Sequence, residues 1–319
     1  MGRGKKIAIG IAAALLLIFA GVGTAAALYI NSINSALSFE DESEARELKE
    51  ALVPVQNEDD SFYVMLLGSD ARGDEASRSD VNILLRVDPT KGQLTMVSIP
   101  RDTKVEIEGY GTQKINAAYA YGGASLAVET VSDFAGVSIS HYAEIHFDEL
   151  ISLIDTLGGV EVEVPVAIHD ENAGGSIEAG LQVLNGEQAL VFARSRAYED
   201  GDFTRTSNQR ILLQAIIDKV LAMPATQLPG TIQSLAQCVT TDYNVNDIVA
   251  LAQKFQSSGS QTMYSGMVPS STATIDGVSY VITDEAAWAE MMQVVDAGED
   301  PAALIERLAA SSKNEPTES

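Results

Sequence analysis

The stretches FYVMLLGSDAR (62–72), RSDVNILLRV (78–87) and LTMVSIPRD (94–102) decide the fold of this 319-residue chain. Each contains a short apolar run of strand length (FYVMLL, VNILLRV and LTMVSI) beside residues that form turns. The second and third runs are separated by DPTKG (88–92), whose proline and glycine favour a turn, so they predict a β-hairpin. We therefore expect the folded domain to begin with three β-strands.

Helical and strand patterns alternate after these runs. Helical spacing is found at 115–134, with an interruption at Gly122-Gly123, and again at 148–157 and 204–223, whereas 142–147 and 160–164 have strand patterns. This alternation predicts a layered α/β domain. Further along, the pattern predicts helices at 231–240, 246–255 and 284–297 and strands at 263–268 and 277–282.

The N-terminus carries an apolar segment, residues 7–30, without a single charge. At about 1.5 Å per residue a helix of this length crosses the hydrocarbon core of a bilayer. A cleaved signal peptide is the alternative, because alanines at 25–27 offer a cleavage site, but its apolar region would be shorter. Basic residues before the segment and an acidic run after it favour a cytoplasmic N-terminus and an extracellular folded part. The sequence predicts a single-pass protein of the cell membrane.

The sequence therefore predicts that the chain has six parts. They are cytoplasmic residues 1–6, a transmembrane helix at 7–30, an acidic stalk at 31–61, the main domain at 62–225, an extension of unknown role packed on that domain at 226–310, and a disordered tail at 311–319.

Composition narrows the classes of function. The chain is 46% hydrophobic and 20% charged with a formal net charge of −25, which is typical of a folded, strongly acidic protein. Such a charge argues against binding to long nucleic acids, which need a basic face. Cys238 is the single cysteine, which excludes an intrachain disulfide and a cysteine-rich metal site.

The basic residues are concentrated in two windows of the sequence. These hold Arg72, Arg78, Arg86, Lys91, Arg101, Lys104 and Lys114, and then Arg194, Arg196, Arg205 and Arg210. The planar guanidinium group of an arginine can donate two parallel hydrogen bonds to one phosphate. The clustering of these residues therefore predicts a phosphate site. The alternative is that each arginine pairs with a neighbouring carboxylate.

Spacing supports the phosphate site. On an extended segment Arg194 and Arg196 would project to the same side. Arg205 and Gln209 lie four apart at the start of the expected helix 204–223, and therefore on one face of it. The N-terminus of a helix also favours anions through its free N–H groups.

Two aspartates suggest a cation at the same site. Asp70 follows the first predicted strand and Asp80 precedes the second, so a ten-residue loop brings both carboxylates to one end of the sheet if the strands are neighbours. One or two carboxylates together with substrate phosphates form the usual coordination of Mg²⁺. The alternative is that both aspartates form turns or caps. The chain has no G-x-S-x-G elbow, phosphate-binding P-loop or H-E-x-x-H motif.

Eight motifs in order resemble those of one family. They are GSDAR (68–72), RSD (78–80), SIPRD (98–102), KINAAY (114–119), LGGV (157–160), LNGEQAL (184–190), RSR (194–196) and GDFTR (201–205). Together they closely resemble the LytR-CpsA-Psr (LCP) family of membrane-anchored ligases of cell-wall glycopolymers. The resemblance covers roughly residues 62–225 and implies a central mixed β-sheet flanked by helices.

The resemblance implies a Mg²⁺-dependent phosphotransferase. Its substrates would be a glycopolymer on a polyprenyl-pyrophosphate carrier and peptidoglycan as acceptor, with the isoprenoid tail in a hydrophobic channel between sheet and helices. By position, Asp70 and Asp80 correspond to residues associated with Mg²⁺. Positions that contact pyrophosphate correspond to Arg78, Arg101, Arg194, Arg196, Arg205 and Gln209. Lys114 and Asp202 belong to motifs without an assigned role, and Asn208 replaces an arginine usual in the family.

Transfer requires neutralised phosphates and an acceptor hydroxyl placed in line with the leaving group. We expect catalytic roles for Asp80, Arg101, Arg194, Arg196 and Arg205. Asp70, Asp80 or Asp102 would take the proton of the acceptor hydroxyl. Two alternatives use the same pocket: a polyprenyl-pyrophosphate hydrolase, and a non-catalytic regulator that binds wall polymer or lipid.

Overall fold

A computed structural model describes residues 41–57, 59–69, 79–198, 202–224, 226–235, 238–259 and 261–312. Within these residues no helix is both long and apolar enough to cross a membrane. The predicted transmembrane helix at 7–30 lies outside the described residues, so it stays a prediction.

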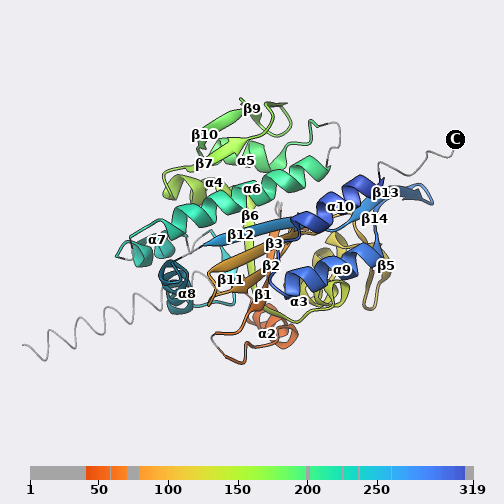
Figure 1. The fold of residues 1–319 in the computed structure, drawn as a ribbon, viewed down its shortest axis with the longest axis horizontal. Coiled ribbons are helices and arrows are strands. Elements are labelled where there is room, and N and C mark those ends of the chain that lie inside the picture. The colour runs from red at the N-terminus through yellow and green to blue at the C-terminus, as the bar shows by residue number, and fades with distance from the viewer. Residues whose placement is uncertain are drawn as a thin grey trace, which may run out of the picture.

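A six-stranded mixed sheet forms the centre of the molecule (Figure 1). Its order is β11-β6-β1-β2-β3-β12, in which β1 runs parallel to β6, β3 runs parallel to β12, and the other pairs are antiparallel. The strands are β1 (Phe62–Ser69), β2 (Ser79–Asp88), β3 (Gln93–Ser98), β6 (Ile139–His146), β11 (Thr240–Thr241) and β12 (Thr262–Met267). The predicted α/β class and its central mixed sheet are confirmed.

The three strands expected from the opening stretches are present, and the hairpin between the last two is confirmed. Asp88 closes its turn by accepting hydrogen bonds from Thr90 Oγ1 (2.8 Å) and from the backbone N–H of Lys91 (3.1 Å). β1 and β2 are neighbours, with Ser69 opposite Ser79 at the last pair of their register. Asp80 therefore lies at the end of the sheet where β1 stops, as predicted for neighbouring strands joined by a ten-residue loop.

Helices cover both faces of the sheet. Met65, Leu84 and Val97 pack on one face against α3 (Asn116–Ala135) and α9 (Glu285–Asp296), and α10 (Ala302–Ser312) joins the same core. Alternate residues such as Val64 and Leu85 pack on the other face, against α6 (Asp202–Leu221) and α8 (Val245–Ser257). Both strand faces are apolar because both are buried in this way.

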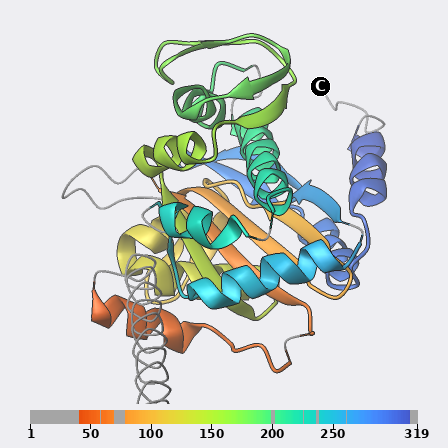
Figure 2. The ribbon, with the colours of Figure 1, turned by 90° about the vertical axis from the view of Figure 1, so that its left-hand side faces the viewer.

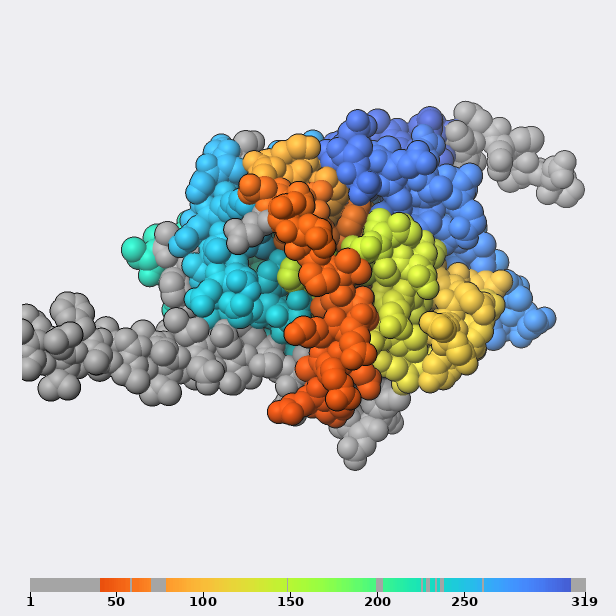
Figure 3. Space-filling view, turned by 90° about the horizontal axis from the view of Figure 1, so that it is seen from below, coloured from red at the N-terminus to blue at the C-terminus, as the bar shows by residue number. Residues whose placement is uncertain are grey.

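The first described helix, α2 (Glu42–Ala51), falls in the predicted stalk but packs on the domain. It lies beside α3 on the underside of the molecule, where Figure 3 also shows the hairpin of β4 (Lys104–Ile107) and β5 (Gly111–Lys114). Leu48 is only 1% exposed there. Helix α3 is kinked at Gly122 and Gly123, and Gly123 adopts φ +61°. The predicted interruption of this helix is thus confirmed.

A smaller unit stands beyond one end of the sheet (Figure 2). It has its own core and contains two short antiparallel ribbons. Its elements are α4 (Phe147–Thr156), β7 (Val160–Val164), β8 (Ile168–Asp170), β9 (Gly175–Ile177), β10 (Gly180–Leu184) and α5 (Gly186–Arg194). Helix α6 contacts both this unit and the sheet, because Leu212 packs into the smaller core while Leu213 packs on the sheet.

The C-terminal segment 226–310 takes part in the main sheet. β11 and β12 form its two edges, α7 (Leu228–Leu235) and α8 lie near them, and β13 (Ser270–Ile275) pairs with β14 (Val278–Thr283). Helix α10 continues to Ser312, two residues into the predicted tail, and residues 313–319 lie outside the described part.

Candidate functional site

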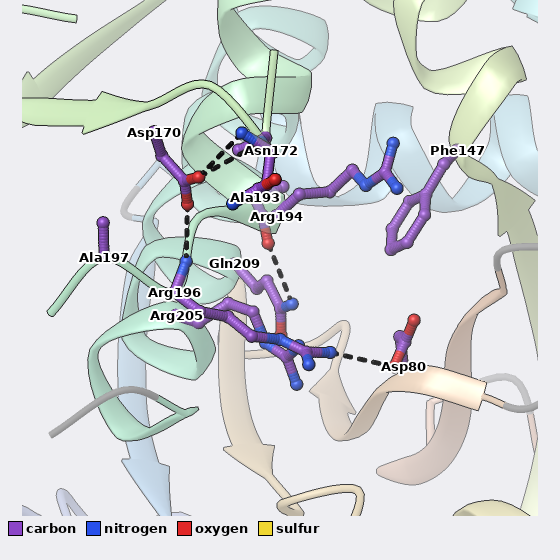
Figure 4. Close-up of a pocket in the computed structure, with 11 residues that line it drawn as sticks. Asp80, Phe147, Asp170, Asn172, Ala193, Arg194, Arg196, Ala197, Arg205 and Gln209 are labelled. Atoms are coloured by element: carbon purple, nitrogen blue, oxygen red, sulfur yellow. Dashed lines mark hydrogen bonds and ion pairs between the residues drawn. The ribbon is translucent and has the colours of Figure 1, made fainter. Parts of the chain in front are cut away.

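A cavity of about 450 Å³ opens between the end of the sheet and the smaller unit (Figure 4). Arginines from three segments reach it or its rim, which places most of the basic groups predicted to bind phosphate together. It is lined by Asp80, Phe147, Asp170, Asn172, Ala173, Ala193, Arg194, Arg196, Ala197, Arg205 and Gln209.

Asp80 is the carboxylate at the sheet side of the cavity. Its Oδ1 accepts a hydrogen bond from Arg101 Nη1, and Arg196 Nη2 lies 3.7 Å from the same oxygen. The side chain of Asp80 is 18% exposed, whereas that of Arg196 is 49% exposed. One carboxylate therefore connects β2, the segment after β3 and the segment after α5.

The motif LNGEQAL builds the helix that carries Arg194. Asn185 and Gln188 form a reciprocal capping box at the start of α5, with Gln188 N donating to Asn185 Oδ1 at 2.9 Å and Asn185 N donating to Gln188 Oε1 at 3.1 Å. Gly186 must be glycine, because a Cβ there would lie 2.5 Å from the backbone oxygen of Ile151. The helix is thereby fixed closely against α4.

Arg194 is the last residue of α5, so the expectation of an extended Arg194-Ser195-Arg196 segment is wrong at Arg194. The helical hydrogen bonding of α5 continues to this point, because the backbone N–H of Ser195 donates to the backbone oxygen of Val191 at 3.0 Å. The guanidinium of Arg194 lies over the ring of Phe147, 5.5 Å from its centroid, and Arg196 follows in the loop. Both arginines nevertheless line the cavity.

Arg205 and Gln209 both line the cavity from α6, as their spacing of four residues predicts. Arg205 is 3% exposed, and Gln209 is fixed by donating from Nε2 to the backbone oxygen of Ala193 at 3.1 Å. The α6 side of the cavity is therefore a buried, positively charged wall.

Asp170 is a site residue that the sequence analysis missed. Its Oδ2 accepts hydrogen bonds from Ser195 Oγ (2.9 Å) and from the backbone N–H of Arg196 (3.1 Å), and its Oδ1 accepts from Asn172 N and Ala173 N. Desolvation raises the pKa of this carboxyl, but the hydrogen bonds from Ser195, Arg196, Ala173 and Asn172 outweigh it and hold the pKa below its usual value. Asp170 therefore ties the Arg194–Arg196 segment to the β8–β9 hairpin.

A row of charges leads from the cavity toward β5. Asp102 Oδ1 lies 4.0 Å from Arg101 Nε and 3.1 Å from Lys114 Nζ, and Arg101 in turn bonds Asp80. Asp102 and Lys114 are thus connected to the site through Arg101, although they do not line the cavity. Asp70 and Arg78 lie outside the described residues, and of Asp202 the structure describes only the backbone, at the first position of α6.

An apolar cavity of about 110 Å³ adjoins the charged one. It lies between the sheet and helices α4 and α6, and Phe147, Ala193 and Gln209 line both cavities. Its other lining residues are Leu66, Leu67, Gly68, Val81, Ile83, Ala143, Ile145, Leu150, Leu212, Leu213 and Ile216. A hydrocarbon chain could enter this space while a phosphate remained among the arginines.

Other basic residues of the two windows have structural roles. Arg86 is 5% exposed at the far end of β2, where it bonds Ser61 Oγ (2.9 Å) and lies 3.7 Å from Asp88. Arg210 is partly buried, and desolvation lowers its pKa to about 10, so it remains charged at neutral pH. The two windows of basic residues in the sequence therefore contain more residues than the site uses.

Comparison with known proteins decides the family. The LytR_cpsA_psr family matches residues 27–296. The chain belongs to this family. A relative from Enterococcus faecalis, a polyisoprenyl-teichoic acid–peptidoglycan teichoic acid transferase TagU, is 35% identical over 293 residues, which covers 89% of this chain and 94% of the relative. The transferase TagU of Halalkalibacterium halodurans is 37% identical over 201 residues, covering 62% and 66% of the two chains.

Solved structures of LCP proteins share the fold. Bacillus subtilis TagV superposes with a TM-score of 0.68 at 28% identity, covering 76% of this chain and 98% of that one. A structure of TagT bound to LI-WTA has a TM-score of 0.64 at 28% identity and covers 75% and 90% of the two chains. The family that the motifs indicated is therefore confirmed, and so is the central mixed sheet that the resemblance implied.

Asn208, which stands where the motif resemblance leads us to expect an arginine, does not line the cavity. It is 2% exposed, and its Nδ2 donates to Tyr198 Oη at 2.7 Å and to the backbone oxygen of Phe192. Its role in this LCP domain is to join α6 to the end of α5. The wall that faces the cavity is formed by Arg205 and Gln209 without it.

Proposed function

We propose that this LCP protein transfers a glycopolymer from a polyprenyl-pyrophosphate carrier to peptidoglycan. The observation that carries the proposal is the pair of adjoining cavities, one lined by arginines and one apolar, with Phe147, Ala193 and Gln209 between them. A lipid-linked phosphate has this same division into an anionic group and a hydrocarbon chain. The transferase names of its relatives agree with the proposal.

The arginines supply the charge that the reaction needs. Arg194, Arg196 and Arg205 face one cavity, where they would neutralise both phosphates and stabilise the charge that develops on the departing polyprenyl phosphate. Arg205 and Gln209 are held by burial, so little reorganisation would accompany the reaction. Arg101 and Arg196 orient Asp80 toward the same space.

We propose Mg²⁺ as the cofactor, with Asp80 and Asp70 holding it. Among the described residues no cluster of three or more His, Cys, Asp or Glu side chains could bind a metal without help. The Asp80 carboxylate at the sheet side of this cavity fits Mg²⁺, which takes most of its remaining ligands from substrate phosphates and water. The ion would supply further positive charge to the phosphate oxygens.

We also propose that the chain is anchored in the cell membrane by residues 7–30, with the domain outside the cell. The uncharged segment and the preceding basic residues support this arrangement. It would tether the domain to the bilayer in which a polyprenyl carrier resides.

The test uses the full chain in proteoliposomes with a radiolabelled lipid-linked polymer and purified peptidoglycan. We expect the wild-type chain to attach label to peptidoglycan, and Arg194→Ala or Asp80→Ala to lower the rate by at least about a hundredfold. Lys91→Ala is the matched control, because this exposed basic residue pairs with Asp88 at the opposite end of β2. Wild-type rates in the Arg194 and Asp80 variants would contradict the site.

The same assay separates the alternatives. Release of polymer at an equal rate with and without peptidoglycan would identify a hydrolase and overturn the transfer reaction. Retention of the lipid-linked polymer without any turnover would identify a binding protein. Loss of transfer on chelation and its return with added Mg²⁺ is the result expected for the cofactor.

A further inference from the structure

Two stacked tyrosines form an exposed aromatic surface at the end of β5 that lies away from the row of charges. The rings of Tyr110 and Tyr121 are 4.4 Å apart at an interplanar angle of 14°, and Tyr110 Oη donates to the backbone oxygen of Tyr121 at 3.4 Å. They are 48% and 44% exposed, although large aromatic side chains usually bury most of their surface. Each ring covers one face of the other, and substantial ring surface remains in solvent.

The backbone fixes both rings in place. Tyr110 is held between Gly109 and Gly111, with φ of +77° and +68°, and its N–H donates to the backbone oxygen of Ile107 at 3.0 Å. Tyr121 directly precedes the kink of α3 at Gly122 and Gly123. The tight turn between β4 and β5 and the interrupted helix α3 thus meet at this aromatic pair.

The pair continues the row that starts in the cavity. Asp80, Arg101, Asp102 and Lys114 alternate in charge along this row, and Lys114 is the last residue of β5. β5 leads from Lys114 back to Tyr110, a distance of about 13 Å at strand spacing. Side chains that donate and accept hydrogen bonds are therefore followed by an aromatic surface, which together suit the hydroxyl groups and the C–H faces of a sugar chain.

Acidic residues near the tyrosines favour a sugar chain without phosphate over one that carries phosphate. Glu106 and Glu108 are exposed on the same hairpin, and the pKa of Glu129 in α3 is raised by desolvation and by the nearby charges of Glu108 and Asp133. Glu44 of α2 lies close to Gly123. A polymer with a phosphate in each repeat would be repelled by these carboxylates.

We infer that Tyr110 and Tyr121 bind the acceptor, a phosphate-free glycan strand, and position its hydroxyl group toward Asp80. The inference rests on the proposed transfer reaction and names the surface that its second substrate occupies. The donor then enters from the arginine and apolar cavities, and the acceptor from the α3 side.

The test measures transfer as a function of peptidoglycan concentration, using the full chain in proteoliposomes and peptidoglycan stripped of wall polymer. For the double variant Tyr110→Ala/Tyr121→Ala we expect the KM for peptidoglycan to rise about tenfold, the cost of losing aromatic stacking. The KM for the lipid-linked donor should stay unchanged, and Tyr110→Phe/Tyr121→Phe should restore acceptor binding because it keeps both rings.

Leu181→Ala/Val183→Ala is the matched control, since these apolar residues of β10 are 66% and 60% exposed and lie on another element. Thermal unfolding of each variant checks that the fold persists. Transfer by the wild type with an unchanged acceptor KM in the double alanine variant would overturn the inference. A raised KM for the donor would overturn it as well, because the surface would then bind the polymer. Absence of transfer in the wild type would instead contradict the proposed function.

Discussion

Asp170 accepts four hydrogen bonds, and the two from Ser195 and Arg196 connect it to a segment that is distant in the sequence. We predict that Asp170→Ala lowers the free energy of unfolding by about 1–3 kcal/mol, because it leaves Ser195 Oγ and several backbone N–H groups without their acceptor. Transfer should fall at least about tenfold, because Arg196 loses its anchor. Denaturant unfolding and the transfer assay measure the two effects.

The pH dependence provides the control for this assignment. The folded-state pKa of Asp170 lies below the value of about 3.9 for an unfolded aspartate, so its stabilising contribution is complete above that pH and is lost as the pH falls through the folded-state pKa. The stability difference between the wild type and Asp170→Asn should therefore be present at pH 7 and shrink below about pH 4. A difference that does not change with pH would contradict the charged role.

At the scale of elements, α2 belongs to the folded domain. Leu48 is 1% exposed in the same core as α3 and α9, and Ser125 Oγ of α3 donates to the backbone oxygen of Glu47. We predict that Leu48→Ala costs about 2–5 kcal/mol of unfolding free energy, as for other large-to-small core substitutions. Val53→Ala is the control, because Val53 is 47% exposed just after the helix. Equal stability of the two variants would show that α2 is a stalk after all.

Elements with a strong local signal were predictable from sequence. The apolar runs of β1, β2 and β3 and the glycines of the α3 kink have this signal, as does the spacing of Arg205 and Gln209. β13 was missed because its sequence, SSTATI, is largely polar and mostly exposed in a two-stranded ribbon. Arg194 was misassigned because α5, which begins at Gly186, continues through it. Asp170 was missed because its role depends on a hairpin that brings it to Arg196 only in the folded chain.

At the scale of the whole molecule, helix α6 joins the core of the smaller unit to one face of the sheet, and the core around α3 lies on the other face. Trp288 is 4% exposed in the core that contains α3, and Cys238 is 4% exposed in the core of the smaller unit. Because α6 packs into the smaller core and onto the sheet, we predict that both parts unfold together. Tryptophan fluorescence and thiol labelling should then give the same denaturant midpoint.

Cys238 is suited to this measurement, because burial and the charge of Glu149 raise the pKa of its thiol and keep it unreactive in the folded state. Labelling at a lower denaturant concentration than the fluorescence change would contradict cooperative unfolding and show that the smaller unit opens alone.

The edge strand β12 can complete the sheet only late in the synthesis of the chain. The residues of β3 are synthesised early, but those of its partner β12 are made only after most of the chain. Until then the nascent chain carries an unpaired strand edge beside the apolar residues of β2 and β3. Contacts of such long sequence separation slow folding, so we expect the unpaired edge of β3 to be open to aggregation until β12 pairs with it.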